Sequence, residues 1–575
     1  MTKIFKSNHS FQILHNWQRQ TLDLVTHIAN EQLVPLVTCK TGSTADMLSA
    51  SSQCSRQLAV ALSRGRATAA AAVKGTMAEP TEEWLRAKPF EEMPGPKPLP
   101  IIGNTWRFLM PSGDYKTTDM AEMMFQMHQQ YGDIAKLVGL PGKPPMVFCF
   151  NANDVEKVYR NEGPRPVRDT VQSIKYYRGV TRKDWFGDIL GVAITQGEQW
   201  YEFRKRVNQP MMQPRSTKLY IPSINQVAQD FTDRMLAIRD ENMKMPADFV
   251  NELNKWALES ISLVALDTRL GCLDGNLPPD SEPQRIIEAA HTAFDCMLKL
   301  DVRPSPWKYI STPAWRRMVK AQDYFYQVAM RHINEAMDRM KKRGAADLSA
   351  GELSVLEKLL VSNDDPRVAI VMALDMMFAG IDTTANSAAT ALYFLSKDQR
   401  VQEKLYQELR AQLPDSASQP FTADTLEACK YLKACVKESM RLHPVAVGGG
   451  RRVMVDNLVL SNYRIPRGVD MILANIVLTN SDEHFSRASE FIPERWLKDD
   501  HSAQTAHPFA FMPFGFGPRM CIGRRFAELE IYTLLARVVR RFQLEFDGEM
   551  RWRTTVLHAP VTPLTLKVTE KEQKV

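Results

Sequence analysis

Apolar residues recur mostly at helical spacing along the body of the chain. One such stretch follows residue 521 and carries apolar side chains at Ile522, Phe526, Leu529, Leu535 and Val539. A longer apolar run, residues 368–395, contains two acids that would be costly in lipid, so we expect a buried core helix there instead of a membrane span. Strand-like pieces are expected within residues 144–150 and 456–466.

The chain has 575 residues, of which 44% are hydrophobic and 24% charged, as in an ordinary globular protein with a large core. Four prolines within residues 93–104 exclude a helix and mark a rigid lead-in to the folded body. We therefore expect residues 78–103 to form a Pro-rich lead-in and residues 104–575 to form the main folded domain.

The N-terminal region predicts a targeting segment. Residues 47–77 carry four basic residues, five serines, many alanines and no acid, which is typical of a mitochondrial transit peptide. A disordered Ser/Ala-rich tail is the alternative. Residues 1–46 contain acids and fit a transit peptide less well. Our hypothesis is that Met47 is the true start and that residues 1–46 are an upstream extension of the gene model.

Charge and cysteine content exclude two classes of protein. The net charge of +7 is small and scattered, and no base-reading motif or basic block is present, so we expect no nucleic-acid partner. The eight cysteines have irregular spacings. They indicate reduced thiols in an intracellular compartment and not a disulfide scaffold.

One cysteine, Cys521, stands out because of its surroundings, FGFGPRMCIG. It lies at or just before a predicted helix N-terminus, where backbone N–H groups favour a thiolate. Flanking glycines allow other atoms to approach the sulfur closely. The thiolate could be a nucleophile or a metal ligand, but the motif holds no base for a nucleophile. A buried structural cysteine is the alternative, and it explains neither the glycines nor Arg519.

This loop resembles the haem-binding loop of the cytochromes P-450, and four further motifs agree with that family: KESMR followed by LHP, FIPERW, AGIDTT and WYEFR. The resemblance covers nearly everything from about residue 94 onward. It implies a mainly α P-450 fold, with a large helical domain and a smaller β-rich region. Haem b would lie between the long central helix and the cysteine loop.

The resemblance also implies which residues hold the haem. Cys521 would be the axial thiolate ligand of the iron, and Phe514 would shield its sulfur from water. The residues expected to hold the haem propionates are Trp200, Arg204, Arg452 and Arg519. The alternative for Trp200 is a plain core position, and the alternative for Arg204 or Arg452 is a solvated position on the surface.

Two other motifs have implied roles. The buried network expected to lock the fold under the haem consists of Glu438, Arg441 and Arg495, in a structural and not a catalytic role. In AGIDTT, Asp382 and Thr383 would relay protons to the oxygen-binding side of the haem. The alternative for the threonines is a bond to their own i−4 carbonyls.

The motifs around the ligand loop resemble the mitochondrial branch of the family. The basic residues expected to receive an acidic ferredoxin of the adrenodoxin type are Lys433, Lys437, Arg524 and Arg525. Electrons would come from NADPH through a ferredoxin reductase. Simple solvation of a helix face is the alternative for each of these residues. The resemblance further implies a peripheral position on the matrix side of the inner mitochondrial membrane.

An apolar substrate cavity is expected from loops that vary within the family. Its candidate residues are Trp185, Phe186, Val445, Val447, Leu557 and Ala559. The implied function is a mono-oxygenase that inserts one oxygen atom of O2 into a small apolar substrate. Resemblance to arthropod mitochondrial members favours a foreign compound over an ecdysteroid hormone. An isomerase or dehydratase that needs no external electrons, or a non-enzymatic haem sensor or carrier, remains the alternative.

Overall fold

Helices make up most of the described structure. The computed structural model describes residues 79–571, apart from residues 101, 109–112, 117–118, 141, 276, 304, 344–352, 414–420 and 498–505. The predicted extension (1–46) and transit peptide (47–77) lie outside the described residues. The chain from Pro80 to Val575 forms one compact unit.

The helices of the first half are α3 (Glu82–Arg86), α4 (Met120–Tyr131), α5 (Ala152–Arg160), α6 (Gln172–Tyr176), α7 (Lys183–Phe186), α8 (Gly197–Met212), α9 (Pro214–Lys218), α10 (Ile221–Ile238), α11 (Phe249–Ala265) and α12 (Glu282–Met297). Those of the second half are α13 (Pro313–Arg343), α14 (Val355–Val361), α15 (Arg367–Lys397), α16 (Gln399–Gln412), α17 (Ala423–Ala428), α18 (Lys430–Leu442), α19 (Asn475–Thr479) and α20 (Arg524–Arg541). Short 3-10 or π turns are η1 (Phe90–Glu92), η2 (Thr105–Phe108), η3 (Tyr177–Thr181), η4 (Leu298–Val302) and η6 (Pro493–Trp496).

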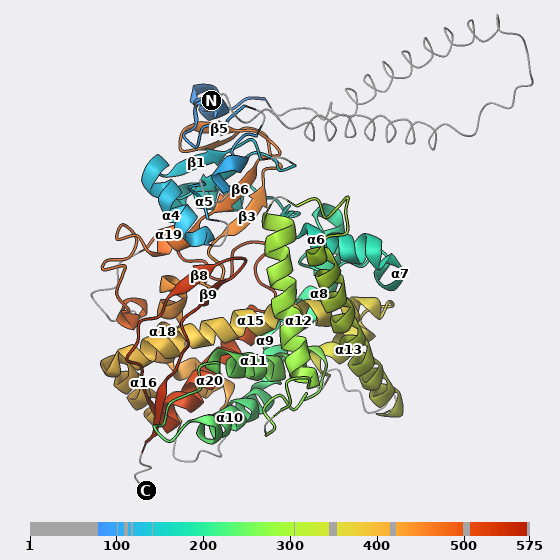
Figure 1. Cartoon of the computed structure of the whole chain (residues 1–575), viewed down its shortest axis with the longest axis vertical. Coiled ribbons are helices and arrows are strands. Elements are labelled where there is room, and N and C mark those ends of the chain that lie inside the picture. The colour runs from blue at the N-terminus through green and yellow to red at the C-terminus, as the bar shows by residue number, and fades with distance from the viewer. Residues whose placement is uncertain are drawn as a thin grey trace, which may run out of the picture. The chain divides into compact units, whose positions relative to one another are not determined.

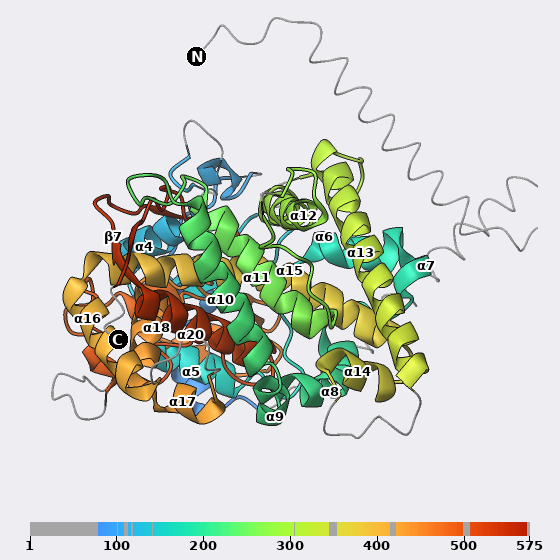
Figure 2. The ribbon, with the colours of Figure 1, turned by 90° about the horizontal axis from the view of Figure 1, so that it is seen from below.

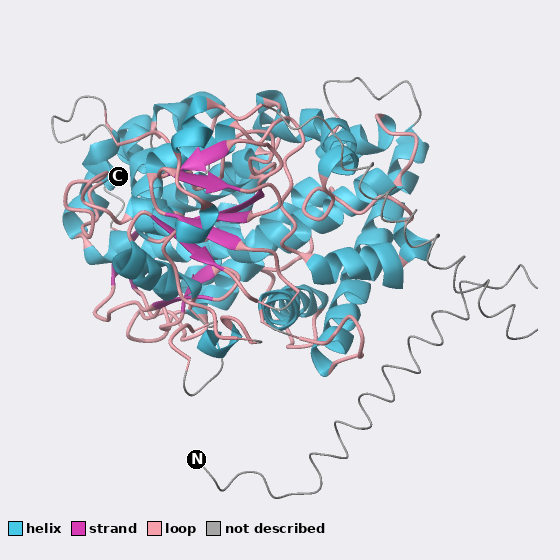
Figure 3. Ribbon diagram, turned by 90° about the horizontal axis from the view of Figure 1, so that it is seen from above, coloured by secondary structure: helices cyan, strands magenta, loops and turns pink. Residues whose placement is uncertain are grey.

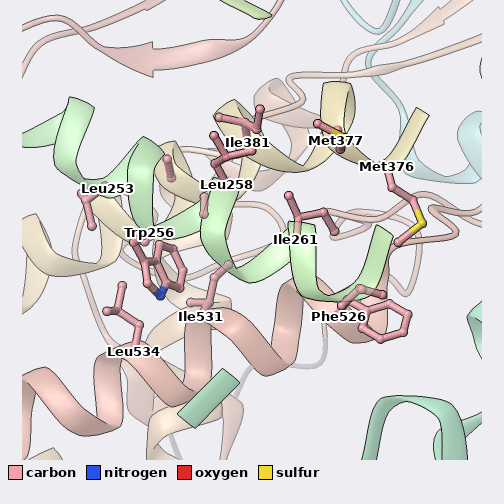
Figure 4. Close-up of a cluster of buried hydrophobic side chains, with 14 of the residues drawn as sticks. Leu253, Trp256, Leu258, Ile261, Met376, Met377, Ile381, Phe526, Ile531 and Leu534 are labelled. Atoms are coloured by element: carbon pink, nitrogen blue, oxygen red, sulfur yellow. The ribbon is translucent and has the colours of Figure 1, made fainter. Parts of the chain in front are cut away.

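The long helix α15 runs through the middle of the helical region, with α11 and α20 packed along it (Figures 1 and 2). Its length and composition would allow a membrane span, but most of its apolar window is buried inside the protein. The prediction of a buried core helix is therefore confirmed. In the close-up of this core, Ile261 of α11, Ile381 of α15 and Phe526 of α20 belong to one apolar cluster (Figure 4).

The strands are short and make up a smaller part of the structure than the helices (Figure 3). They are β1 (Ile134–Leu137), β2 (Met146–Cys149), β3 (Gly449–Arg452), β4 (Leu458–Leu460), β5 (Tyr463–Ile465), β6 (Asp470–Leu473), β7 (Phe542–Glu545), β8 (Trp552–Thr554), β9 (His558–Pro560) and β10 (Lys567–Glu570). The largest sheet has the order β1-β2-β6-β3, and the pairs β4-β5, β8-β9 and β7-β10 form three small sheets. Both predicted strand regions are confirmed, by β2 and by the β4-β5 hairpin.

The register of the large sheet sets one wall of the site. β2 pairs with β6 in parallel, with Met146 opposite Asp470, and β3 pairs with β6 antiparallel, with Gly449 opposite Leu473. β3 therefore holds the segment that follows α18 against the helical region. The mainly α fold with a smaller β-rich part, expected from the sequence, is confirmed.

Candidate active site

A cavity of about 350 Å³ lies between α15 and the loop that precedes α20. On the α15 side its wall includes Met372, Asp375, Met376, Ala379, Gly380, Thr383 and Thr384. On the loop side it includes Met512, Phe514, Gly515, Arg519, Met520, Cys521, Ile522 and Gly523. The predicted cysteine loop and the predicted central helix therefore face one cavity.

The loop holds Cys521 just before α20, whose N-cap is Gly523. The Cys521 N–H donates to the Phe514 carbonyl at 2.9 Å, which closes the loop. Gly515 and Gly517 have φ of +71° and +73°, values that L side chains rarely adopt, so the turn requires glycine at both positions. Cys521 lines the cavity, so its accessible surface faces this space inside the protein.

Opposing effects act on the Cys521 thiol. Burial inside the protein raises its pKa, while the backbone N–H groups of Gly523 and Arg524 and the charges of Arg204 and Arg168 lower it, and burial is the largest effect. The sequence predicted the contribution of the helix N-terminus correctly. It did not predict that burial would outweigh this contribution, because burial depends on segments far from the loop.

Arg519 is held firmly beneath the cavity. Its Nε donates to the Pro166 carbonyl at 3.0 Å and its Nη2 to the Thr195 carbonyl at 2.8 Å, and its guanidinium lies 4.3 Å from the Trp200 ring centre. Burial and neighbouring arginines lower its pKa to about 9. Arg519 Nη1 and Trp200 Nε1 are buried and have no hydrogen-bond partner among the described residues.

Three further arginines line the same cavity: Arg168, Arg204 and Arg451. Arg168 Nε is another buried donor without a partner in the described part of the chain. Burial lowers the pKa of Arg204 to about 10, and Arg168 contributes further to that lowering. Arg451 pairs with the buried Glu162. The four cavity arginines outnumber the nearby carboxylates Glu162, Asp375 and Glu530, and Asp375 is already paired with Arg178. The excess of positive charge suits a ligand with two carboxylates.

These observations test whether the residues fit a haem. The cavity offers a cysteine sulfur on its floor, unused N–H donors on Trp200, Arg168 and Arg519, and excess positive charge along one side. A flat macrocycle with two propionates would satisfy both the donors and the charge. The residues present therefore fit a haem.

The structure corrects one predicted propionate contact. Arg452 does not line the cavity; its Nε donates to Asp470 Oδ1 at 2.7 Å, and its Nη1 lies 3.6 Å from Asp169 Oδ2. Arg451, its neighbour in β3, lines the cavity instead. Successive residues of a strand point to opposite faces, so a choice between two adjacent arginines depends on a register that the motif alone does not fix.

The AGIDTT motif splits between the two sides of α15. Thr383 lines the cavity, and its Oγ1 donates to the Ala379 carbonyl at 2.6 Å, the i−4 bond that was the alternative reading. Asp382 is buried but does not line the cavity, and its Oδ1 lies 2.9 Å from His291 Nε2 on α12. A Cβ on Gly380 would lie 2.9 Å from Ile261 Cγ1, so α11 packs closely against α15 here.

The predicted network on α18 is assembled around Glu438. Its Oε1 accepts from Arg441 Nη2 at 2.8 Å and from Arg495 Nε at 3.0 Å, and its Oε2 accepts from Trp496 Nε1 at 2.8 Å. Arg441 Nη1 also donates to the carbonyls of Thr479 and Ala488. The structure thus brings the three predicted residues together in a buried cluster.

The four predicted partner-binding residues lie on α18 and α20, which pack against each other. Lys433 is paired with Glu427 at 2.8 Å, and Arg524 with Glu528 at 3.0 Å. Lys437 is exposed and lies 5.7 Å from the Trp496 ring centre. Arg525 is exposed and has no ion pair among the described residues. Of the four residues, Lys437 and Arg525 therefore carry the charge that is not compensated by an acid among the described residues.

Of the six predicted substrate residues, only Val445 lines this cavity. Trp185 stacks on Tyr326 with ring centres 4.3 Å apart, and Phe186 is buried in the core. Val447 is buried against the large sheet. Leu557 and Ala559 belong to the β8-β9 hairpin, which meets the cavity wall where His558 N–H donates to the Val445 carbonyl at 2.9 Å. These five residues do not line this cavity.

Sequence reasoning missed other residues of the wall. The apolar ones are Val192, Ala193, Ile261, Met372 and Met376. The polar ones besides the arginines are Asn475 and Glu530, both buried, each with one side-chain oxygen that has no partner among the described residues. Burial raises the pKa of Glu530 well above its usual range. An acid at a core position of an otherwise apolar helical stretch was the signal that could have identified Glu530.

Comparisons with known proteins agree with this geometry. A family model described as cytochrome P-450 matches residues 93–567. The chain is 42% identical over 492 residues to the probable mitochondrial cytochrome P-450 301a1 of Drosophila melanogaster, covering 85% of this chain and 88% of that relative. It is 38% identical over 530 residues to the probable cytochrome P-450 49a1 of the same fly, covering 90% and 89%. It is 38% identical over 493 residues to the mitochondrial cytochrome P-450 12b1 of Drosophila acanthoptera, covering 83% and 90%.

Proposed function

Because the chain belongs to the cytochrome P-450 family of haem-thiolate mono-oxygenases, we propose that it hydroxylates a small apolar compound. The balanced reaction is R–H + O2 + NADPH + H⁺ → R–OH + H2O + NADP⁺. One oxygen atom enters the substrate and the other leaves as water, so two protons must reach the site in each turnover. When bound, the haem supplies the iron at which dioxygen is activated.

The observation that carries this proposal is the cavity itself, in which the Cys521 sulfur faces the Thr383 segment of α15. Cys521 would hold the iron, and Trp200, Arg168, Arg204, Arg451 and Arg519 would hold the propionates. The unused N–H donors of three of these residues support this assignment. Phe514 lies beside the cysteine in the cavity wall and would shield its sulfur from water.

Thr383 and Asp382 are proposed to hold and deliver the protons. Thr383 and Thr384 both line the cavity, and the Thr383 hydroxyl has a fixed acceptor in the Ala379 carbonyl. Because the hydroxyl hydrogen of Thr383 is bonded to this carbonyl, the lone pairs of Oγ1 are left to accept a proton that comes by way of Asp382. Thr383→Ala would remove this group and divert reducing equivalents into hydrogen peroxide. If product formed per NADPH were unchanged in that variant, the proposed role of Thr383 in proton delivery would be contradicted.

The electron donor is proposed to be an acidic ferredoxin, reduced by a reductase with NADPH. Exposed Lys437 and Arg525 on the joined surface of α18 and α20 support this partner. Several relatives are named mitochondrial, and the composition of residues 47–77 supports the same compartment. We place the enzyme on the matrix side of the inner membrane as a peripheral protein. Exposed Tyr309 and Ile310 between α12 and α13 offer apolar contacts to a lipid surface.

The substrate class proposed is an apolar foreign compound, with an ecdysteroid as the competing class. Methionine and small aliphatic side chains on α15 and before α8 supply an adaptable wall, as suits compounds of varied shape. The direct test is turnover of a compound panel with ferredoxin, reductase and NADPH, preceded by the spectrum of the reduced carbon monoxide complex. A thiolate-type Soret band with NADPH-dependent product supports the proposal. Product without NADPH would indicate an isomerase or dehydratase, and haem binding without any product would indicate a sensor or carrier.

A further inference from the structure

His291 of α12 connects the protein surface to Asp382. The His291 side chain is 48% exposed, whereas the Asp382 side chain is 8% exposed, and 2.9 Å separates His291 Nε2 from Asp382 Oδ1. The next residue along α15, Thr383, lines the cavity. One surface imidazole, one buried carboxylate and one cavity hydroxyl therefore follow one another across the helix.

The hydrogen-bond chemistry fixes which imidazole nitrogen carries the proton. As a carboxylate Asp382 can only accept, so in the resting site Nε2 donates to it. Asn254 of α11 places its amide 3.2 Å from the same Nε2, while its other amide atom, Oδ1, is buried without a partner among the described residues. Exchanging the two amide atoms by a half-turn makes Oδ1 a second acceptor for Nε2–H. Both neighbours then hold the tautomer with hydrogen on Nε2.

We propose that His291 is the solvent-side end of the proton path to Thr383, a role that rests on the proposed function of Asp382 and Thr383. A proton from water binds Nδ1, which makes no hydrogen bond to any described residue. The Nε2 proton then passes to Asp382 Oδ1. Asp382 then delivers its proton toward the Thr383 hydroxyl and is a carboxylate again. The neutral imidazole, left with hydrogen on Nδ1, is reset when that proton returns to water and Nε2 takes a new proton from water. No oxidant or reductant enters these steps.

The groups around the imidazole support a reversible proton carrier. Asp382 faces it from α15, Asn254 from α11, and Glu288 contributes from its own helix, α12. Burial lowers the pKa of His291, but the hydrogen bond and charge of Asp382 together with Glu288 raise it above its ordinary value overall. His291 can thus hold a proton near neutral pH and release it to its buried partner.

The test compares His291→Gln, His291→Ala and the matched control His128→Gln in the haem-loaded enzyme. His128 is a partly exposed histidine of α4 whose Nε2 lies 3.9 Å from Asp133 Oδ1. It does not line the cavity. Glutamine preserves an N–H donor for Asp382 but cannot carry a proton. We expect His291→Gln to slow product formation about tenfold and to raise peroxide per NADPH. This is below the ~10²–10⁴-fold effect of a group at the reacting atoms because water can partly substitute.

The pH profile separates proton transfer from simple positioning. The wild-type rate should show a titration that is absent in His291→Gln, while His128→Gln keeps the wild-type profile. If His291→Gln matches the wild type and only His291→Ala loses coupling, the histidine merely holds Asp382 and the inference is overturned. If Asp382→Asn and Thr383→Ala uncouple turnover but neither His291 variant does, the proposed function stands and this inference fails. If Asp382→Asn has no effect, the path through it is disproved together with that part of the proposed function.

A second measurement does not depend on activity. Histidine labelled with ¹⁵N in the resting enzyme gives ring signals, and the signal lost in His291→Gln identifies His291. We expect Nε2 to stay protonated throughout, Nδ1 to titrate, and the titration midpoint to fall in Asp382→Asn because the carboxylate charge is removed. A midpoint that is unchanged by Asp382→Asn would overturn the proposed coupling.

Discussion

Glu438 and Arg441 face each other across one turn of α18, joined by two hydrogen bonds of 2.8 and 3.0 Å, and neither side chain has any exposed surface. Arg495 adds a third bond from η6. The cluster ties α18 to the segments that precede the cysteine loop. We propose that this network supports the fold around the cysteine loop and has no catalytic role.

Glu438→Ala should therefore abolish haem incorporation. The change leaves two arginines buried without their carboxylate, which costs about 3–5 kcal/mol of folding free energy. The reduced carbon monoxide spectrum and the urea midpoint measure the two effects. Glu82→Ala serves as control because the Glu82–Arg86 pair is exposed, and it should change stability by less than about 0.5 kcal/mol. A normal haem content in Glu438→Ala would refute the structural role.

Arg451→Ala should weaken haem retention far more than Arg452→Ala. Arg451 lines the cavity, whereas Arg452 is engaged with Asp470 on the opposite face of β3. The rate at which haem moves to an excess of apomyoglobin measures retention, and we expect it to rise about tenfold or more for Arg451→Ala, as for a lost charged hydrogen bond. Arg451→Ala with Glu162→Gln controls for the carboxylate left unpaired. Equal rates for the two single variants would contradict the assignment.

The proposed ferredoxin surface predicts unequal effects among its basic residues. Lys437→Gln and Arg525→Gln should each raise the KM for ferredoxin and flatten its dependence on salt, because these charges are exposed and steer the encounter. Lys433→Gln should have a smaller effect, because Lys433 is already paired with Glu427. Steady-state rates between low and physiological ionic strength give the comparison. An equal effect of all three would argue against a defined contact, and substrate-binding spectra should stay unchanged throughout.

The buried His558 and its half-buried neighbour His443 predict how stability depends on pH. His443 Nδ1 lies 3.0 Å from His558 Nε2, and burial lowers the pKa of His558 from 6.5 to about 4. Between those values the unfolded chain binds more protons than the folded chain, so stability falls as the pH drops from about 6.5 to about 4. The loss for His558 alone is about 3 kcal/mol. Urea unfolding at several pH values should show a shallower decline for His558→Gln, and an identical decline would contradict the prediction.

The sequence allowed the local parts of the site to be predicted and left the long-range parts open. The loop around Cys521, the α18 pair and the apolar run of α15 each depend on neighbours within a few residues, and all three are found where they were expected. The choice of Arg451 over Arg452 depended on the pleat of β3. The partner of Asp382 lies on a different helix, at His291, and no local motif marks it.

The substrate wall was predicted least well for the same reason. Aromatic residues such as Trp185 occur in the expected loop, but they pack against α13 instead of the cavity. Apolar character shows that a side chain will be buried, but it does not show which of several buried spaces the side chain will fill. Only the packing of whole elements decides this.

The parallel pairing of β2 with β6 has a consequence for the order in which the protein is made. The large sheet cannot form until the strand at Asp470 is available to pair with the strand at Met146. In the same way, Arg168 and Arg204 can share a cavity with Arg451 and Arg519 only after the last quarter of the chain has been synthesised. Closing such large loops is slow, because their entropy must be lost before the contacts form. The residues that would hold the cofactor are therefore complete only after the last quarter of the chain has folded, and chains truncated before residue 521 should remain colourless.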